Sequence, residues 1–228
     1  MSEMVEFSAN GKTTTGYLEL PSPGRGPGVV VIQEWWGLAP HIKDVVTRFA
    51  NEGFVALAPD LYHGKKTEEP DDADKMMMAM NVDRAAKDMT GAVEYLSSHP
   101  AVTSSEKIGA VGFCMGGGLV LWLACLSKKV AAAVPFYGAA PWPAASPNFD
   151  ESVAAFQGHY AENDDWAGPE LAKGLETKLR GLGLEAVFHV YPDTEHAFFN
   201  DDRPEAHHAE ASQLAWDRTV EFLRHRLA

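Results

Sequence analysis

The strongest constraint on the fold of this 228-residue chain lies between residues 107 and 126. Residues 107–111 have the apolar character of a short strand, and residues 119–126 form an apolar run rich in helix formers. Between them stands Gly112-Phe113-Cys114-Met115-Gly116. Glycines on both sides of one residue permit a strained turn and a close approach of helix to strand, because they carry no Cβ atom. The segment predicts a tight strand-turn-helix unit with Cys114 at its apex.

Cys114 has two interpretations. At the N-terminus of a helix its sulfur would lie beside unsatisfied N–H groups, which favour the thiolate and therefore a nucleophile. Alternatively it is an inert thiol in a glycine-rich turn, since free cysteine is among the most buried residue types. The choice depends on whether a base, an orienting acid and an oxyanion hole occur where the fold would bring them.

The remaining sequence alternates between strand-like and helix-like segments, which predicts a single α/β domain over residues 1–228 with no separate lid domain. The order favours a mostly parallel central sheet covered by helices on both faces. An Asn10-Gly11 turn predicts an N-terminal hairpin. We expect strands at 5–7, 14–20, 28–32, 54–58, 107–111, 130–136, 153–156 and 186–191, and helices at 41–51, 76–96, 115–127, 169–180 and 205–226.

Two further segments are the acidic residues 68–74 and the methionine cluster within 76–80. We expect residues 68–74 to form a solvated acidic loop. The methionines within 76–80 either fill the core or form a flexible pocket wall, and helical spacing favours the core.

Composition excludes several classes of protein. The formal net charge of −13 argues against nucleic-acid binding and does not favour anionic membranes. The N-terminus lacks the features of a signal peptide, and no apolar run has the length of a membrane span. With only two cysteines, Cys114 and Cys125, no disulfide framework is needed, so a reducing cytoplasm is the expected compartment. No metal-ligand spacing or phosphate-binding loop is found, and we expect neither metal nor cofactor.

Candidate partners for Cys114 follow later strands. Acids Asp164 and Asp165 come after the strand near 156, and His196 follows the last strand. The carboxyl ends of parallel strands meet at one edge, where open α/β sheets bind ligands. Of the other histidines, His63 and His159 could line a pocket and His189 alternates within a strand. The rest fall in or beside helices and are expected to be solvated: His41, His99, His207, His208 and His225. Spacing alone does not separate the two aspartates.

Glu34 is unusual because it directly follows the buried strand 28–32 and precedes Trp35-Trp36-Gly37. A carboxylate there is costly unless it is solvated or paired. It is either part of the site or a turn residue at the rim of the crevice.

The strand-turn-helix with its Gly-x-Cys-x-Gly sequence resembles the nucleophile elbow of the α/β-hydrolase fold, in which nucleophile, acid and histidine follow in that order. Over essentially its whole length the sequence is similar to the dienelactone hydrolase (carboxymethylenebutenolidase) family. The matching segments are Gln33-Glu34-Trp35-Trp36-Gly37, Pro59-Asp60-Leu61-Tyr62, Gly112-Phe113-Cys114-Met115-Gly116-Gly117, Ala161-Glu162-Asn163-Asp164 and His196-Ala197-Phe198.

The resemblance implies a cofactor-independent hydrolase of small esters or lactones. It implies Cys114 as nucleophile, His196 as base and Asp164, rather than Asp165, as orienting acid. It also implies that Glu34 contacts the resting thiol and helps to deprotonate it when substrate arrives. The implied oxyanion hole consists of the backbone N–H groups of Met115 and Trp35.

Substrate recognition departs from the family pattern. Enzymes of the chlorocatechol pathway carry a carboxylate-binding arginine shortly after the catalytic histidine, whereas this chain has Phe198-Phe199-Asn200, with Arg203 further on. We expect the substrate-binding residues to be Trp36, Tyr137, Phe198 and Arg203.

Three functions are therefore compared. The leading hypothesis is a dienelactone hydrolase-like enzyme that acts as a monomer or a weak homodimer on a small molecule, without nucleic acid or membrane. The second is a broader carboxylesterase or thioesterase. The third is a redox-sensing protein in which Cys114 is an oxidisable thiol.

Overall fold

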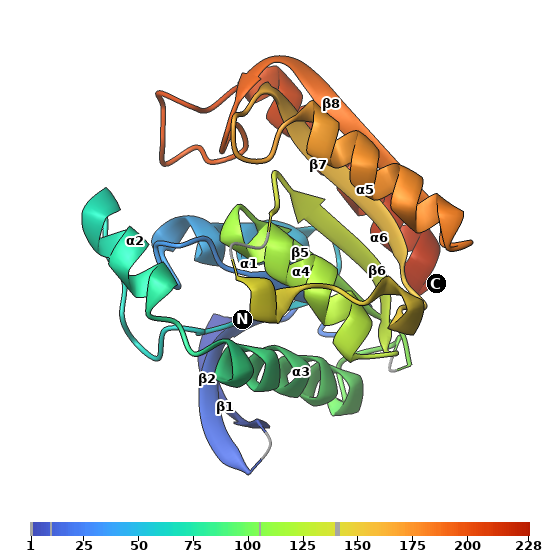
Figure 1. Ribbon diagram of the computed structural model, residues 1–228. Helices are drawn as coiled ribbons and strands as arrows, with labels where there is room; N and C mark the ends of the chain where they lie inside the picture. The colour runs from blue at the N-terminus through green and yellow to red at the C-terminus, as the bar shows by residue number, and fades with distance from the viewer. Residues whose placement is uncertain (1, 10, 105, 140–141) are drawn as a thin grey trace.

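The central sheet has eight strands in the order β1-β2-β4-β3-β5-β6-β7-β8 (Figure 1). The computed structural model describes residues 2–9, 11–104, 106–139 and 142–228. β1 and β2 form the predicted hairpin, whose Asn10 lies outside the described residues; β2 is antiparallel to β4, and all later pairings are parallel. The strands are β1 Ser2–Ala9, β2 Lys12–Glu19, β3 Gly28–Ile32, β4 Val55–Pro59, β5 Ile108–Phe113, β6 Val130–Phe136, β7 Ala155–Asn163 and β8 Ala186–Glu195.

Helices cover both faces of the sheet, as the alternation of elements predicts. Side chains of α3, α4 and α5 pack on one face, and those of α1 and α6 pack on the other (Figure 1). The helices are α1 Pro40–Asn51, α2 Pro70–Met78, α3 Val82–Ser98, α4 Met115–Leu126, α5 Pro169–Gly181 and α6 Ala209–Leu227, with short 3₁₀ turns at Pro143–Ala145 and Phe149–Glu151.

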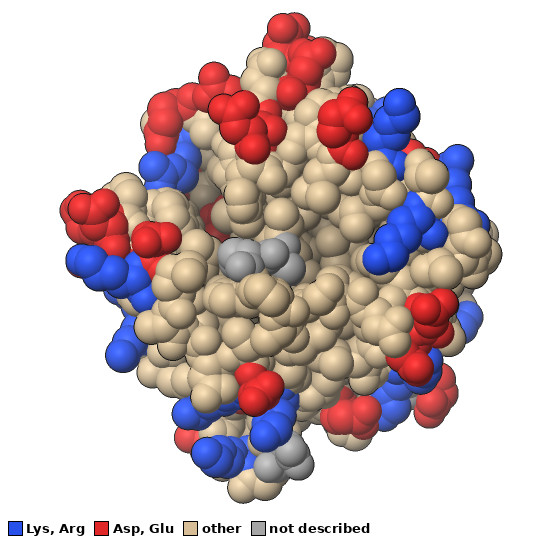
Figure 2. All heavy atoms as spheres, in the orientation of Figure 1, with Lys and Arg blue, Asp and Glu red and all other residues tan. Residues whose placement is uncertain are grey.

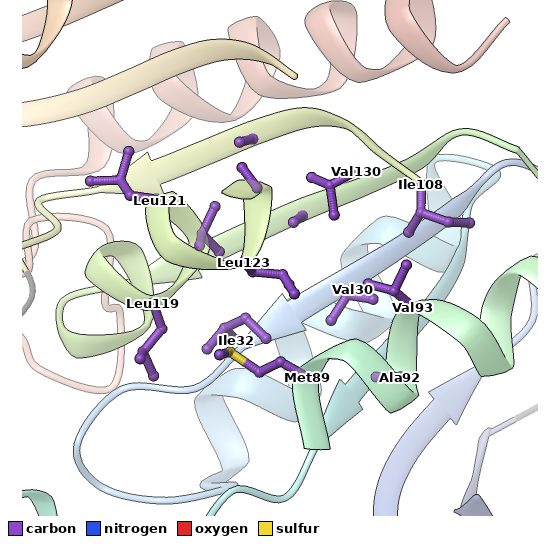
Figure 3. Packing of buried hydrophobic residues seen from close by; sticks show 14 of the residues in the cluster. Val30, Ile32, Met89, Ala92, Val93, Ile108, Leu119, Leu121, Leu123 and Val130 are labelled. Atoms are coloured by element: carbon purple, nitrogen blue, oxygen red, sulfur yellow. The ribbon is translucent and has the colours of Figure 1, made fainter. Parts of the chain in front are cut away.

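The central strands are apolar throughout because both of their faces are buried. In β3, Val30 and Ile32 point to the α3/α4 side, whereas Val29 and Val31 point to the α1/α6 side. Figure 3 shows Val30 and Ile32 packed among Met89, Val93 and Leu119 from the covering helices. Both layers of the core thus hold β3 and β5 in place, and the site residues follow these strands.

Several boundaries differ from the sequence prediction. The acidic stretch 68–74 is not a loop throughout, because α2 begins at Pro70 with Asp71 and Asp72 in its first turn, where the helix dipole favours acids. The expected helix 76–96 is two helices, separated where Asn81 caps α3. β7 and β8 are longer than predicted, and α6 starts at Ala209 rather than near Glu205.

One face of the molecule shows how the charged side chains are spread. On the face shown in Figure 2, acidic and basic side chains are interspersed around the periphery, and the centre is largely uncharged. Among the described residues, no helix is both long and apolar enough to cross a membrane.

Candidate active site

Cys114 lies at the predicted turn between β5 and α4. Its backbone has φ 54° and ψ −118°, a conformation that a non-glycine residue adopts only under strain. The turn is held by the Cys114 N–H, which donates to the Phe136 carbonyl (3.0 Å), and by the Cys114 carbonyl, which accepts from Gly117 and Gly118. A Cβ atom at Gly116 would lie 2.5 Å from the carbonyl oxygens of Ile32, the last residue of β3, and of Gln33. Only glycine therefore lets α4 start this close to the sheet.

His196 and Asp164 form a hydrogen-bonded pair. The Nδ1 atom of His196 lies 2.6 Å from Oδ2 of Asp164, and Oδ1 of Asp164 accepts the N–H groups of Trp166 and Ala167, both at 2.9 Å. Burial acts to raise the pKa of Asp164, but the hydrogen bond and charge of His196 and the two N–H donors outweigh it and lower the pKa. The ionised carboxylate only accepts, so Nδ1 carries the proton and Nε2 is free to act as a base.

The alternative acid and the alternative histidines have different surroundings from Asp164 and His196. Asp165 is exposed, and Asp164 is buried. His159 is fully buried in β7, where it bonds Tyr191 and Thr219, and His63 pairs with Asp88. The expectation that His41 is solvated is wrong: its side chain is only 3% exposed, because its ring packs edge-on against Phe113 and Phe199.

Glu34 is buried rather than solvated at a rim. Its Oε2 accepts a hydrogen bond from Nδ2 of Asn200 at 2.7 Å. Desolvation raises the pKa of Glu34, and the opposing effects of His41, His196, Asn200 and Arg203 do not cancel it. Glu34 is therefore a carboxyl group that takes up a proton more readily than an ordinary glutamate.

The position of Cys114 at a helix N-terminus favours a thiolate, but its surroundings favour the protonated resting thiol beside Glu34. Burial and the neighbouring carboxylate of Glu34 raise its pKa, and the N–H of Met115 opposes them only in part. Within the described part of the chain, the thiol has no hydrogen bond to His196 or Glu34, whose own bonds go to Asp164 and Asn200. Glu34 acts on the resting thiol through its charge.

Two backbone N–H groups lie beside the elbow. Met115 is the first residue of α4, and its N–H interacts with the Cys114 sulfur. Trp35 lies three residues after the end of β3, the neighbour of β5 in the sheet, and its N–H has no backbone acceptor among the described residues. Donors at neighbouring strand ends have the character of an oxyanion hole.

A cavity of about 550 Å³ opens over Cys114 and His196. Trp35, Trp36 and Trp166 form much of its wall, and Met77 and Pro70 of α2 close one side. Met77 thus serves as pocket wall, although Met76, Met77 and Met80 also pack against the core. Of the cavity-lining residues that the structure describes, Arg203 is the one with a lysine or arginine charge; it stacks on Trp36 (4.6 Å to the ring centroid) and pairs with Glu205 (2.9 Å).

The expected substrate contacts divide into two groups. Trp36 and Arg203 line the cavity, but Tyr137 and Phe198 are fully buried and do not. The Tyr137 ring packs edge-on against His196, with ring centroids 5.0 Å apart, and Phe198 packs edge-on against Tyr137. These residues follow strand ends, as predicted, but their side chains turn into the core and support the loop that carries His196.

Comparisons with known proteins identify the family of this chain. The family model described as "Dienelactone hydrolase family" matches residues 14–227. The chain belongs to the dienelactone hydrolase family. It is 37% identical to "Protein usf" of Aquifex pyrophilus over the full length of both chains. It is 32% identical to a "Putative carboxymethylenebutenolidase" of Aquifex aeolicus, with 98% of each chain covered.

Solved structures give the same fold. A putative dienelactone hydrolase from Klebsiella pneumoniae superposes with a TM-score of 0.85 at 24% identity, covering 98% of this chain and 99% of that one. The dienelactone hydrolase-like promiscuous phosphotriesterase P91 from metagenomic libraries gives 0.86 at 21% identity, covering 100% and 99%. The chain is a hydrolase of this family with a mostly parallel eight-stranded sheet.

Two residues of this dienelactone hydrolase family site escaped the sequence analysis. Asn200 holds Glu34, and its only sequence signal was its place shortly after His196, where charge rather than amide chemistry was expected. His41 faces the same carboxylate from α1, and Asp201 binds its Nδ1 (3.2 Å). Nothing in the spacing of α1 indicates that its first turn packs against a strand end on another part of the sheet.

Proposed function

We propose that this hydrolase cleaves small esters or lactones through an acyl-enzyme on Cys114, with His196 as base and Asp164 as its orienting acid. The observation that carries the proposal is the 2.6 Å pair of His196 and Asp164 at the cavity that contains the elbow cysteine. A neutral imidazole held in one tautomer by an ionised carboxylate is suited to take a proton from water.

The chemistry proceeds in two steps. Substrate brings a carbonyl to the N–H groups of Trp35 and Met115, and Glu34 takes the thiol proton as sulfur attacks the carbonyl carbon. The C–O bond then breaks, leaving a thioester on Cys114. In the second step, His196 takes a proton from water as its oxygen attacks, the C–S bond breaks, and the proton returns to sulfur.

The cavity favours an apolar or aromatic ester. Its wall is rich in tryptophan, and the charge of Arg203 is already shared with Trp36 and Glu205. A relative from Bradyrhizobium, 30% identical, is named a "Probable 2-oxo-3-(5-oxofuran-2-ylidene)propanoate lactonase", so lactones belong in the same screen. Measuring kcat/KM for cis- and trans-dienelactone beside p-nitrophenyl esters ranks the two substrate classes.

The geometry does not favour a redox sensor. Reactive sensor thiols have a lowered pKa and good exposure, whereas burial and Glu34 raise the pKa of the Cys114 thiol. A redox sensor also does not require His196 as a base or Asp164 as an orienting acid.

The test compares the two cysteines. Cys114→Ala should abolish steady-state hydrolysis of p-nitrophenyl acetate, because no nucleophile remains. Cys125→Ala, a matched change of a partly buried thiol in α4, should keep most of the activity. Normal turnover by a folded Cys114→Ala variant would exclude the acyl-enzyme.

A further inference from the structure

A second cavity adjoins the substrate cavity and differs from it in character. It measures about 420 Å³, and polar groups make up a far larger share of its wall than of the wall of the substrate cavity. Glu34, Trp36, Arg203 and Glu205 border both cavities, so the Trp36–Arg203 stack lies at their junction. A polar cavity of this size accommodates several hydrogen-bonded waters.

His41 is one of the residues that line this cavity, and one of its ring nitrogens is buried without a hydrogen-bond partner among the described residues. Its Nδ1 lies 3.2 Å from Oδ1 of Asp201, and a carboxylate accepts, so Nδ1 carries the proton of the neutral ring. Its Nε2 is then a lone-pair acceptor, and it is buried without a hydrogen-bond partner among the described residues. An unpaired buried acceptor is costly, and a water or a proton in the cavity would satisfy it.

The reaction leaves a proton that has to depart. Ester and water give carboxylate, alcohol and one H⁺. In the proposed cycle, the thiol proton passes by way of Glu34 to the leaving oxygen as the C–O bond breaks. The proton of the hydrolytic water returns through His196 to sulfur. The surplus proton is the one that the acid product loses on ionising beside Glu34, while product still occupies the substrate cavity.

We propose that the polar cavity is the proton exit of this enzyme: Glu34 takes the surplus proton and passes it through cavity water to Nε2 of His41, and from there it reaches solvent. The inference rests on the proposed function, because it requires an acyl-enzyme cycle in which Glu34 gains a proton. His41 is a positioning and relay residue that touches neither substrate nor sulfur.

The groups around His41 can stabilise a transient imidazolium. Asp201 holds Nδ1 of His41 and would stabilise an imidazolium, while Arg48 of α1 also binds Asp201. Glu34, Asn200 and Arg203 also line the polar cavity, and Arg203 borders the substrate cavity as well. Exposed carboxylates of Glu68, Asp202 and Glu205 line it toward solvent and can collect the proton.

His41→Asn tests the relay directly. The amide can still donate to Asp201 but has no nitrogen that takes a proton. We expect the pre-steady-state burst of p-nitrophenol to keep its rate and amplitude, because acylation precedes the surplus proton. Steady-state kcat should fall about tenfold, less than for loss of a direct catalytic base because cavity water remains. Imidazole added at constant pH and ionic strength should restore kcat, which a purely structural defect would not allow.

A control and a second variant complete the design. His225→Asn makes the same change on the exposed end of α6 and should show neither a lower kcat nor an imidazole effect. Asp201→Asn keeps an acceptor for Nδ1 but removes the charge that stabilises the imidazolium, so kcat should fall less and again recover with imidazole. It replaces His41→Asn as the test if that variant does not fold.

The possible failures are distinguishable. An unchanged kcat with no dependence on imidazole, in a variant with a normal burst, overturns the relay and leaves the Cys114 mechanism standing. A burst that slows in parallel with kcat also overturns it, since His41 would then act in shaping Glu34. Full activity of Cys114→Ala would refute the proposed function itself.

Discussion

Glu34 and Asp164 are both buried carboxyl groups beyond the ends of parallel strands, yet their surroundings shift their pKa values in opposite directions. Asp164 receives two N–H donors and the His196 ring, and its pKa is lowered. Glu34 has one amide donor, from Asn200, and desolvation raises its pKa. The balance between desolvation and the donors and charges around each carboxylate therefore separates a group that stays ionised from one that is poised to accept a proton.

The largest effect should come from neutralising Asp164. Asp164→Asn removes the charge that holds His196 in one tautomer, and the amide can present its N–H₂ to Nδ1. By analogy with the amidated triad aspartate of a serine protease, kcat should fall by about 10⁴-fold. Asp165→Asn, an identical change on the exposed neighbour, should alter kcat by less than about twofold, as surface substitutions do. Steady-state kinetics on one ester decides, and the reverse ranking would give the acid role to Asp165.

A smaller effect should appear in stability, with opposite signs for the two carboxyl groups. The lowered pKa of Asp164 contributes stability above the ordinary aspartate pKa, and this is lost as pH falls through the native value. The raised pKa of Glu34 means that ionising it costs stability as pH rises from the ordinary glutamate value through its native value. Near pH 7, Asp164→Asn should therefore destabilise the fold and Glu34→Gln should stabilise it.

Denaturant unfolding at two pH values measures both effects. Near pH 7 the two variants should lie on opposite sides of the wild type. At a pH of about 4 the difference for Glu34→Gln should shrink, because the raised pKa brings that carboxyl close to its protonated state, whereas the difference for Asp164→Asn should persist until the pH falls through the lowered native pKa of Asp164. Two variants that both destabilise the protein, by amounts that do not change with pH, would show that the comparison rests on packing rather than on charge.

Most of the fold and the chief site residues followed from the sequence for a simple reason. Parallel strands of buried β-branched residues share one carboxyl edge, so the sequence predicts that Glu34, Cys114 and His196 lie at the same edge of the sheet. Spacing does not separate Asp164 from Asp165, because the predicted strand ends at residue 156, whereas β7 continues to Asn163, directly before Asp164. The placement of the two aspartates relative to His196 depends on where β7 ends.

Side-chain direction was beyond the sequence. Tyr137 and Phe198 follow strands β6 and β8 as expected, but their side chains turn inward. The Tyr137 ring packs edge-on against His196, and Phe198 packs edge-on against Tyr137. The sequence predicts that His41, in the first turn of α1, is a solvated helix residue, but its ring packs against Phe113 and Phe199. Such placements depend on how separate elements pack, which no local pattern contains.

The central claim is that Glu34 serves acylation of Cys114 and His196 serves its removal. Mass spectrometry of variants mixed with a p-nitrophenyl ester and quenched tests it most directly. His196→Asn should accumulate one acyl group on the peptide that carries Cys114, and Glu34→Gln should accumulate far less while remaining folded. Acyl groups found on Cys125 or on neither cysteine in His196→Asn, or equal acylation in the two variants, would contradict the account.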